Sequence, residues 1–257
     1  MLTAARSTSI GPGDVDLLDR ACDSAPVLPG NRLIAALDVA TRAQADDLLT
    51  RLAGVPSWVK IGLELFTSLG PSIVEEVAAR GYKVMLDLKL HDIPETVARA
   101  TAAVANLGAS LCTVHAAGGR TMLEAAVAAA GPMRILAVTV LTSLDEHDLE
   151  EIGALGPMAN LVVRRAQLAT SAGCGGVVAS PNEVSALRAA LPSASWLVTP
   201  GIRPSGSPAG DQKRITTPTI ARRAGSDLIV VGRPIRDAAD PAAAARAIVA
   251  ELESVQA

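Results

Sequence analysis

The 257-residue chain is 49% apolar and carries a formal net charge of −3. Such a chain can bury one large core but offers no basic surface for nucleic acid or an anionic membrane. Three cysteines without CxxC spacing and only three histidines argue against a disulfide framework and against a zinc or His-rich metal site. No apolar run reaches the roughly 18–20 residues of a membrane span, and the start of the chain lacks the apolar core of a secretory signal. We therefore expect a reduced, cytoplasmic protein that binds neither nucleic acid nor membrane.

The first 30 residues predict an N-terminal extension outside the folded core. They contain Gly and Pro clusters at 11–13 and 26–30 and leave room for one short helix, over residues 14–22. Residues 31–257 are expected to form a single domain. Within it, short β-like runs alternate eight times with Ala-rich helical stretches.

The pattern of these runs predicts the fold. The expected strands are 33–37, 58–61, 83–86, 111–114, 135–140, 176–179, 196–198 and 228–231. The expected helices are 42–52, 73–80, 95–107, 122–130, 158–172, 181–190, 218–224 and 241–252. Apolar strands that alternate with helices are typical of a parallel sheet covered by helices, and eight such units in about 225 residues predict a (β/α)8 (TIM) barrel. A doubly wound open sheet is the alternative, because periodicity does not show closure, although no GxGxxG follows the first strand.

Polar residues gather where a barrel would place its catalytic groups, at the C-terminal ends of the strands. They are Asp38 after the first strand, Lys60 in the second, Asp87 and Lys89 after the third, His115 after the fourth, Thr142 and Ser143 after the fifth, Arg203 after the seventh and Arg233 after the eighth. Strand ends carry polar residues in many proteins. Cationic groups from separate strands that converge on one barrel mouth in an acidic chain instead indicate an anionic substrate.

The most informative run lies at the end of the third strand. Asp87, Lys89 and Asp92 place two carboxylates and one ammonium within six positions. Side chains alternate along a strand, so Asp87 and Lys89 are expected on the same face. Charges at the end of a buried strand are costly to hold and are candidates for catalysis. The alternative is an ordinary Asp87–Lys89 ion pair followed by a helix that Asp92 caps, with Pro94 and Glu95 in its first turn.

Gly232 and Arg233, after the last strand, form a second candidate site. The loops after strands seven and eight of a barrel commonly bind phosphate. Gly232 would let the backbone approach the ligand, and Arg233 would donate two parallel hydrogen bonds to it. An arginine that only covers the barrel rim is the alternative. The loop 203–218 is long for a compact domain and is expected to close over the ligand as a lid, with Arg203 and Gln212 best suited to contact it.

These residues lie in a pattern that resembles the orotidine 5′-phosphate decarboxylase family. Residues 87–96, DLKLHDIPET, match the family's D-x-K-x-x-D-I-P-x-T run. Further motifs occur in the family's order: ALD at 36–38, VKIG at 59–62, LTS at 141–143, TPGIR at 199–203, GDQ at 210–212 and VGR at 231–233. The resemblance covers residues 33 to about 252.

The resemblance implies a reaction and a role for each site residue. The enzyme would convert orotidine 5′-phosphate to uridine 5′-phosphate, the last step of de novo pyrimidine synthesis, without a metal or organic cofactor. Asp87, Lys89 and Asp92 would surround the reacting carbon, and Lys89 would stabilise and protonate the C6 carbanion. Asp92 and Thr96 would reach the site of the partner subunit in a homodimer. The substrate would be held by Asp38 and Lys60 at the ribose, Thr142 and the Ser143 backbone at the pyrimidine, Pro200 at the pocket wall, and Arg203, Gln212, Gly232 and Arg233 at the phosphate.

Two other functions share some of these features. Mg²⁺-dependent decarboxylases and aldolase-like enzymes of sugar phosphates have this barrel and much of the D-x-K-x-x-D run. Ile93-Pro94 and the TPGIR run at 199–203 favour the nucleotide enzyme over them. A catalytically inactive phosphate-binding barrel is the second alternative, and the intact Asp87, Lys89 and Asp92 speak against it.

Overall fold

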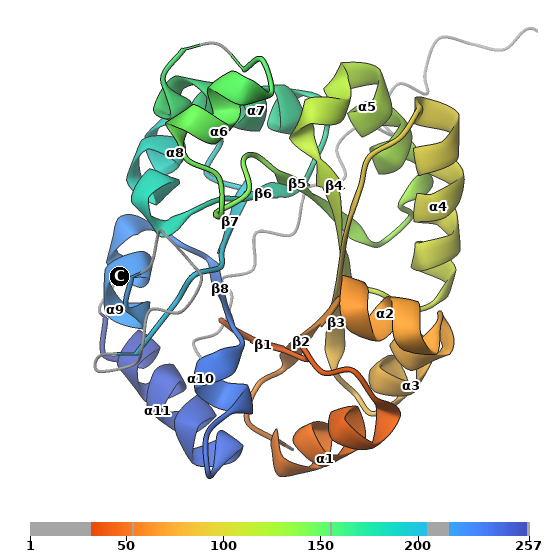
Figure 1. Ribbon diagram of the computed structural model, residues 1–257, viewed down its shortest axis with the longest axis vertical. Coiled ribbons are helices and arrows are strands. Elements are labelled where there is room, and N and C mark those ends of the chain that lie inside the picture. The colour runs from red at the N-terminus through yellow and green to blue at the C-terminus, as the bar shows by residue number, and fades with distance from the viewer. Residues whose placement is uncertain (1–31, 53, 155, 205–215, 256–257) are drawn as a thin grey trace, which may run out of the picture.

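The computed structural model describes residues 32–52, 54–154, 156–204 and 216–255. Eight parallel strands form a closed barrel in the order β1 to β8, with helices around it (Figure 1). The predicted (β/α)8 barrel is therefore confirmed, and the open doubly wound sheet is excluded because β8 pairs with β1. The extension predicted for residues 1–30 lies outside the described residues.

The strands are buried on both faces, which explains why their sequences are apolar at almost every position. Inside the barrel the side chains pack on one another, and outside it they pack on the helices. The strands are β1 Leu33–Ala36, β2 Trp58–Gly62, β3 Lys83–Leu90, β4 Leu111–His115, β5 Arg134–Val138, β6 Gly176–Val178, β7 Trp196–Thr199 and β8 Leu228–Val231.

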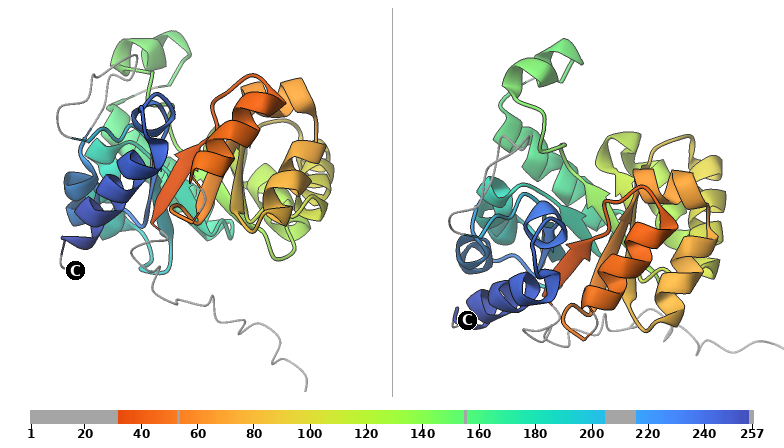
Figure 2. Two further views of the ribbon diagram at one scale, coloured as in Figure 1. Left: turned by 90° about the horizontal axis from the view of Figure 1, so that it is seen from below. Right: turned by 60° about the horizontal axis from the view of Figure 1, so that its bottom comes forward.

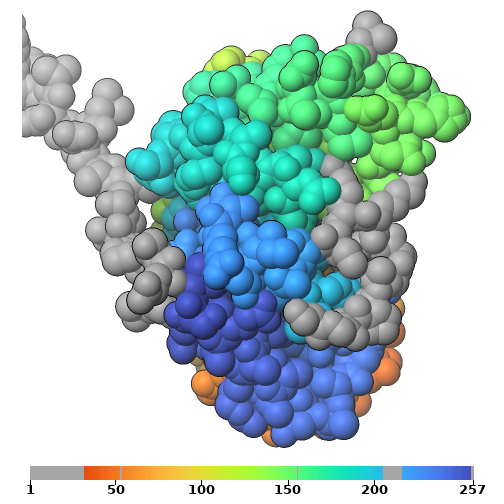
Figure 3. Space-filling view, turned by 90° about the vertical axis from the view of Figure 1, so that its left-hand side faces the viewer, coloured from red at the N-terminus to blue at the C-terminus, as the bar shows by residue number. Residues whose placement is uncertain are grey.

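The helices turn an apolar face to the strands and a polar face outward. Figure 3 shows one side of this outer layer, with α8, α9 and α11. The α-helices are α1 Arg42–Leu52, α2 Leu63–Leu69, α3 Ser72–Ala79, α4 Pro94–Asn106, α5 Gly119–Ala129, α6 Glu146–Glu151, α7 Met158–Ser171, α8 Val184–Ala190, α9 Pro218–Ala224, α10 Arg233–Arg236 and α11 Pro241–Glu253. Two 3₁₀ turns, η2 Ala116–Gly118 and η3 Pro181–Glu183, precede α5 and α8. Within the described ranges, no helix is long and apolar enough to cross a membrane.

Three helices were not predicted, namely α2, α6 and α10, which have seven, six and four residues. Helices this short have few turns over which an apolar stripe can be recognised, although α9, also of seven residues, was predicted at 218–224. Helix α6 stands off the barrel beyond β5 (Figure 2). It begins at a reciprocal pair of hydrogen bonds in which the Asp145 side chain accepts from the Asp148 N–H and the Asp148 side chain accepts from the Asp145 N–H.

The core has two parts because strand side chains alternate between the two faces of the barrel wall. In β1, Ile34 and Ala36 belong to the inner cluster, whereas Leu33 and Ala35 pack in the outer cluster against the helices. Bulky residues fill the N-terminal end of the inner cluster. Trp58 of β2 and Trp196 of β7 meet edge to face there, with ring centroids 6.1 Å apart. The barrel is therefore packed at the end where the strands begin.

Candidate active site

A cavity of about 450 Å³ lies at the opposite end of the barrel, where the strands finish. This is the end at which the sequence predicts the catalytic groups. Barrel closure brings together residues from the beginning and the end of the chain. The predicted site residues that line the cavity are Asp38, Lys60, Asp87, Lys89, Thr142, Pro200, Arg203, Gly232 and Arg233.

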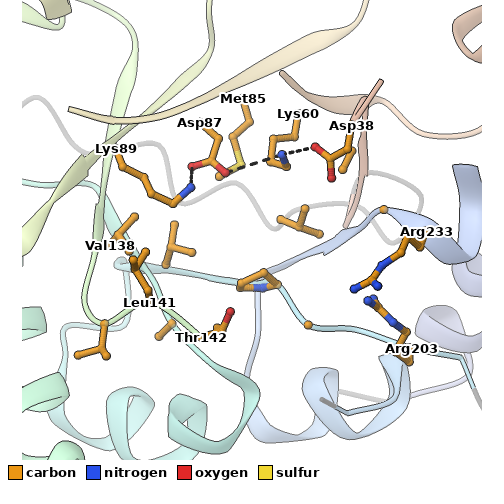
Figure 4. A pocket seen from close by; sticks show the side chains of 18 of the residues that line it. Asp38, Lys60, Met85, Asp87, Lys89, Val138, Leu141, Thr142, Arg203 and Arg233 are labelled. Carbon is orange, nitrogen blue, oxygen red and sulfur yellow. Dashed lines mark hydrogen bonds and ion pairs between the residues drawn. The ribbon is translucent and has the colours of Figure 1, made fainter. Parts of the chain in front are cut away.

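Alternating charges run along one wall of the cavity (Figure 4). Lys60 Nζ donates to Asp38 Oδ1 at 2.8 Å and lies 3.8 Å from Asp87 Oδ2, and Lys89 Nζ donates to Asp87 Oδ1 at 2.9 Å. Each ammonium neutralises a neighbouring carboxylate, which lets the half-buried wall hold four charged groups. In the part of the chain that the structure describes, no three His, Cys, Asp or Glu side chains are grouped so that they could hold a metal ion.

Asp87 is the central member of this wall, and its side chain is 14% exposed. Burial acts to raise the pKa of Asp87. The ammonium groups of Lys60 and Lys89, and the hydrogen bonds from Lys89 and Thr113, act in the other direction and outweigh burial, so the pKa is lowered. Asp87 is therefore a carboxylate at neutral pH, suited to holding an ammonium and not to donating a proton.

The end of β3 does not follow the regular strand geometry expected from the sequence. The strand runs to Leu90, four residues beyond its predicted end, because pairing with β4 resumes there. Leu86 pairs with Cys112, and Leu90 pairs with Val114. Between these two pairs β3 advances by four residues and β4 by only two, so β3 contains a bulge. Within this bulge Lys89 has a φ of 52°, a left-handed conformation that residues with a side chain rarely adopt. The predicted placement of Asp87 and Lys89 on the same face is confirmed, because both line the cavity and their side chains are in contact. The backbone that carries them is nevertheless a bulge and not the regular strand that the prediction assumed.

Two arginines mark the other end of the cavity. Arg203 and Arg233 come from different segments, and their side chains point toward each other across the cavity from Lys89 (Figure 4). Arg203 is only 7% exposed. At Gly232, an added Cβ would lie 3.2 Å from Asp38 Oδ2, a tight contact, so the close approach of this backbone to Asp38 favours glycine. Converging guanidinium groups suit a phosphate, and the place of Arg233 in the cavity wall does not fit an arginine that only covers the rim.

Three of the predicted site residues that the structure describes are not brought into the cavity of this chain. Asp92, Thr96 and Ser143 are exposed and lie outside its lining. Gln212, with most of the predicted lid, lies outside the described residues. The Asp92 carboxylate accepts a hydrogen bond from the Ile93 N–H at 2.6 Å, while α4 has Ile93 as its N-cap and no side-chain cap. The alternative in which Asp92 caps this helix is therefore wrong.

Known proteins are similar to this chain in both sequence and fold. The orotidine 5′-phosphate decarboxylase / HUMPS family matches residues 31–248. An orotidine 5′-phosphate decarboxylase of Anaeromyxobacter sp. (strain K) is 55% identical over 225 residues, which are 87% of this chain and 99% of that protein. One of Halorhodospira halophila (strain DSM 244 / SL1) is 52% identical over 86% of this chain and 95% of its own length. The chain belongs to the orotidine 5′-phosphate decarboxylase / HUMPS family.

A solved structure supports this membership. The crystal structure of orotidine 5′-phosphate decarboxylase from Lactobacillus acidophilus matches with a TM-score of 0.78 and 40% identity, over 86% of this chain and 99% of that chain. The family and the enzyme class predicted from the motifs are therefore confirmed.

The apolar floor of this decarboxylase-family cavity was not predicted from the sequence. Met85, Val138, Val178 and Val230 line the cavity and belong to the inner core cluster. A signal was present, because Met85 lies two positions before Asp87 and therefore on the same face of β3. Arg236 was also missed. It lines the cavity and its Nη1 donates to the Asp38 carbonyl at 2.9 Å, a contact that no local pattern indicates.

His115 was expected at the barrel mouth but lies outside the cavity lining. Its ring stacks on that of His91, with centroids 5.3 Å apart and planes 17° from parallel. Its side chain accepts a hydrogen bond from the Ala117 N–H at 3.2 Å. Burial, helped by the nearby His91, Arg165 and Lys89, lowers the pKa of His115 to about 4. The imidazole is therefore neutral at physiological pH.

Proposed function

We propose that this enzyme removes CO2 from orotidine 5′-phosphate and forms uridine 5′-phosphate, the last step of de novo pyrimidine synthesis in the cytoplasm, without a metal or organic cofactor. Membership of the family supports this proposal. The observation that carries it is the division of one cavity into two ends. The Lys60–Asp87–Lys89 group lines one end, and Arg203 and Arg233 line the other (Figure 4). Such a cavity suits a substrate that reacts at one end and carries a phosphate at the other.

The chemistry at the first end assigns the central role to Lys89. Decarboxylation breaks the bond between C6 of the orotate ring and its carboxylate carbon, and the electron pair stays on C6. This carbanion lies in the ring plane, where the π system does not delocalise it well. The Lys89 ammonium beside C6 stabilises the charge and then transfers a proton to C6, and the amine regains its proton from solvent. Asp87 holds the ammonium in place through the 2.9 Å contact.

The remaining predicted residues bind and orient the substrate. Remote binding at the phosphate can organise the reacting end, because binding energy there is available to position the ring. In this proposal Asp38 and Lys60 hold the ribose hydroxyls, Thr142 and the Ser143 backbone bind the pyrimidine edge, Pro200 lines the pocket, and Arg203, Gln212, Gly232 and Arg233 bind the phosphate.

A homodimer completes the proposed site. Asp92 and Thr96 would extend into the cavity of the partner subunit, where Asp92 would join Asp87 and Lys89 around the reacting carbon. Their exposure in the single chain, outside its own cavity lining, supports this arrangement. The adjoining Ile93 is 67% exposed, which suits a surface that a partner covers. The catalytic unit would be residues 31–257, and the family match from residue 31 supports residues 1–30 as an extension.

The direct test is turnover of orotidine 5′-phosphate by the purified full-length protein, followed by ultraviolet absorbance. We expect turnover that EDTA does not affect. Lys89→Ala should lower kcat by more than about 10⁴-fold, since it removes both the charge stabilisation and the proton donor. Lys83→Ala is the matched control, because Lys83 lies in the same strand at its exposed N-terminal end. No turnover by the wild-type protein would contradict the proposal, and loss of turnover in EDTA would favour the Mg²⁺-dependent sugar-phosphate enzymes.

Subunit mixing tests the shared site separately. A heterodimer of Lys89→Ala and Asp92→Ala subunits contains one site with both residues intact and one that lacks both. Random reassociation makes about half of the dimers mixed, so about a quarter of wild-type activity is expected. No recovery after subunit exchange has been demonstrated by mass spectrometry would exclude the shared site.

A further inference from the structure

Thr113 is a fully buried polar residue behind the reacting end of the cavity. It lies in the middle of β4 and is 0% exposed. It does not line the cavity. A buried hydroxyl in a barrel wall requires hydrogen-bond partners, since leaving it without them costs free energy. The partners of Thr113 are both in the bulged end of β3.

The Thr113 hydroxyl joins two groups of the candidate active site. It donates to Asp87 Oδ1 at 2.9 Å, the same oxygen that accepts from Lys89 Nζ. It also accepts from the Lys89 backbone N–H at 2.9 Å. A hydroxyl has one proton to donate and lone pairs to accept, so a single oxygen holds both the carboxylate and the backbone of the lysine.

The second bond bears on the unusual backbone of Lys89. A left-handed conformation persists in a residue with a side chain only where the surrounding structure holds it. The bulge interrupts the backbone pairing of β3 with β4 between Leu86 and Leu90, and there the Lys89 N–H is bonded to a side chain. The Thr113 hydroxyl thus takes the place of a strand carbonyl at the position where the lysine leaves the regular strand.

We propose that Thr113 is a positioning residue for the reaction, because its hydroxyl holds the Asp87 carboxylate and the left-handed Lys89 backbone in the one arrangement that presents the ammonium to the substrate. The proposal rests on the proposed function of Lys89. Thr113 acts through these two residues and not through contact with the substrate. Its loss should therefore lower kcat and leave substrate binding largely unchanged.

Thr113→Val tests this role, because valine keeps the shape of threonine and removes the hydroxyl. The substitution removes a hydrogen bond to the charged Asp87 carboxylate, and we expect kcat to fall about 10- to 100-fold with KM within about threefold. Thr113→Ala serves as a second hydroxyl-free variant, and Thr113→Ser should recover most of kcat. Thr139→Val is the matched control. Thr139 is also 0% exposed, but its hydroxyl donates to the Val178 carbonyl, so kcat should stay near the wild-type value.

Crystal structures of Thr113→Val and Thr113→Ser provide a readout that does not depend on the substrate. In Thr113→Val we expect Lys89 to leave the left-handed region and its Nζ to move away from Asp87, and in Thr113→Ser both features should remain. Unchanged Lys89 geometry in Thr113→Val would overturn the proposal, as would a wild-type kcat. A serine variant no more active than the valine variant would also overturn it, because a hydroxyl would then be insufficient. Failure of the wild-type protein to turn over orotidine 5′-phosphate would instead refute the proposed function, and the structures would still report on the positioning.

Discussion

Replacing Lys89 by glycine and by alanine should separate the strain in its backbone from the role of its side chain. Lys89 is the only residue other than glycine with a positive φ among those that the structure describes. An L-residue in the left-handed region costs about 1–2 kcal/mol, whereas glycine pays about 0.5–1 kcal/mol in extra chain entropy on folding. The difference predicts that Lys89→Gly is more stable than Lys89→Ala by about 1 kcal/mol. Both variants lose the same ammonium, so the contact with Asp87 cancels in the comparison.

Thermal and urea unfolding followed by circular dichroism would measure this difference. For a chain of this size, 1 kcal/mol corresponds to about 2–4 °C in Tm. The same pair of substitutions at Lys83 is the control, because Lys83 lies at the regular start of β3, where alanine should be more stable than glycine by about 0.5–1 kcal/mol. Both Lys89 variants should be inactive. A Lys89→Ala variant as stable as Lys89→Gly would refute the reasoning, since the left-handed backbone would then cost alanine no more than the extra chain entropy costs glycine.

Three further outcomes follow from other contacts. His115 has a folded-state pKa of about 4, below its ordinary 6.5. Between these two values the unfolded chain binds more protons than the folded chain, so the Tm should fall as the pH is lowered from 6.5 toward 4. His115→Gln should reduce this dependence of Tm on pH, and an equal dependence in both proteins would contradict the prediction. Asp227→Asn removes the charge that pairs with Arg188 at 2.6 Å, where the two side chains are 26% and 28% exposed. The substitution should lower the free energy of unfolding by about 2 kcal/mol and the Tm by about 4–8 °C. A Tm within about 1 °C of wild type would show that the pair adds little. Arg233→Met should lower kcat/KM about 100-fold, mainly by raising KM, because it removes a charge-assisted contact with the phosphate. A KM within about twofold of wild type in steady-state kinetics would contradict a role for Arg233 at the phosphate.

The barrel and most of the polar side chains that line the cavity could be predicted because both follow from local patterns. Apolar runs of strand length that alternate with amphipathic stretches leave few solutions other than a helix-covered parallel sheet. Polar residues in or after the C-terminal end of each strand are then assigned to the barrel mouth, which places Asp38, Lys60, Arg203 and Arg233 there without any knowledge of contacts. His115 shows the limit of this rule. It ends β4 as expected but stacks on His91 outside the cavity lining.

Short elements could not be predicted, for a different reason. Helices α2, α6 and α10 are too short to carry a long apolar stripe, and of the three only α6 begins with a side-chain cap. Strand β3 continues from Asp87 to Leu90 because Asp87 pairs with β2 and Leu90 with β4. The apolar run that defines the strand in the sequence stops at Leu86. The end of such a strand is therefore set by its pairing with neighbouring strands, which a local sequence pattern does not show.

The sequence by itself determined the repeating architecture and the chemical types at the reacting and phosphate ends. Only the tertiary structure decided how those groups are held. The left-handed backbone of Lys89 and its tie to the Thr113 hydroxyl, 24 residues away, depend on the register of β3 against β4. Register is set by the closure of the whole barrel and by the packing of its inner core. A linear pattern can therefore indicate that a carboxylate and an ammonium lie near each other, but not which buried hydroxyl joins them.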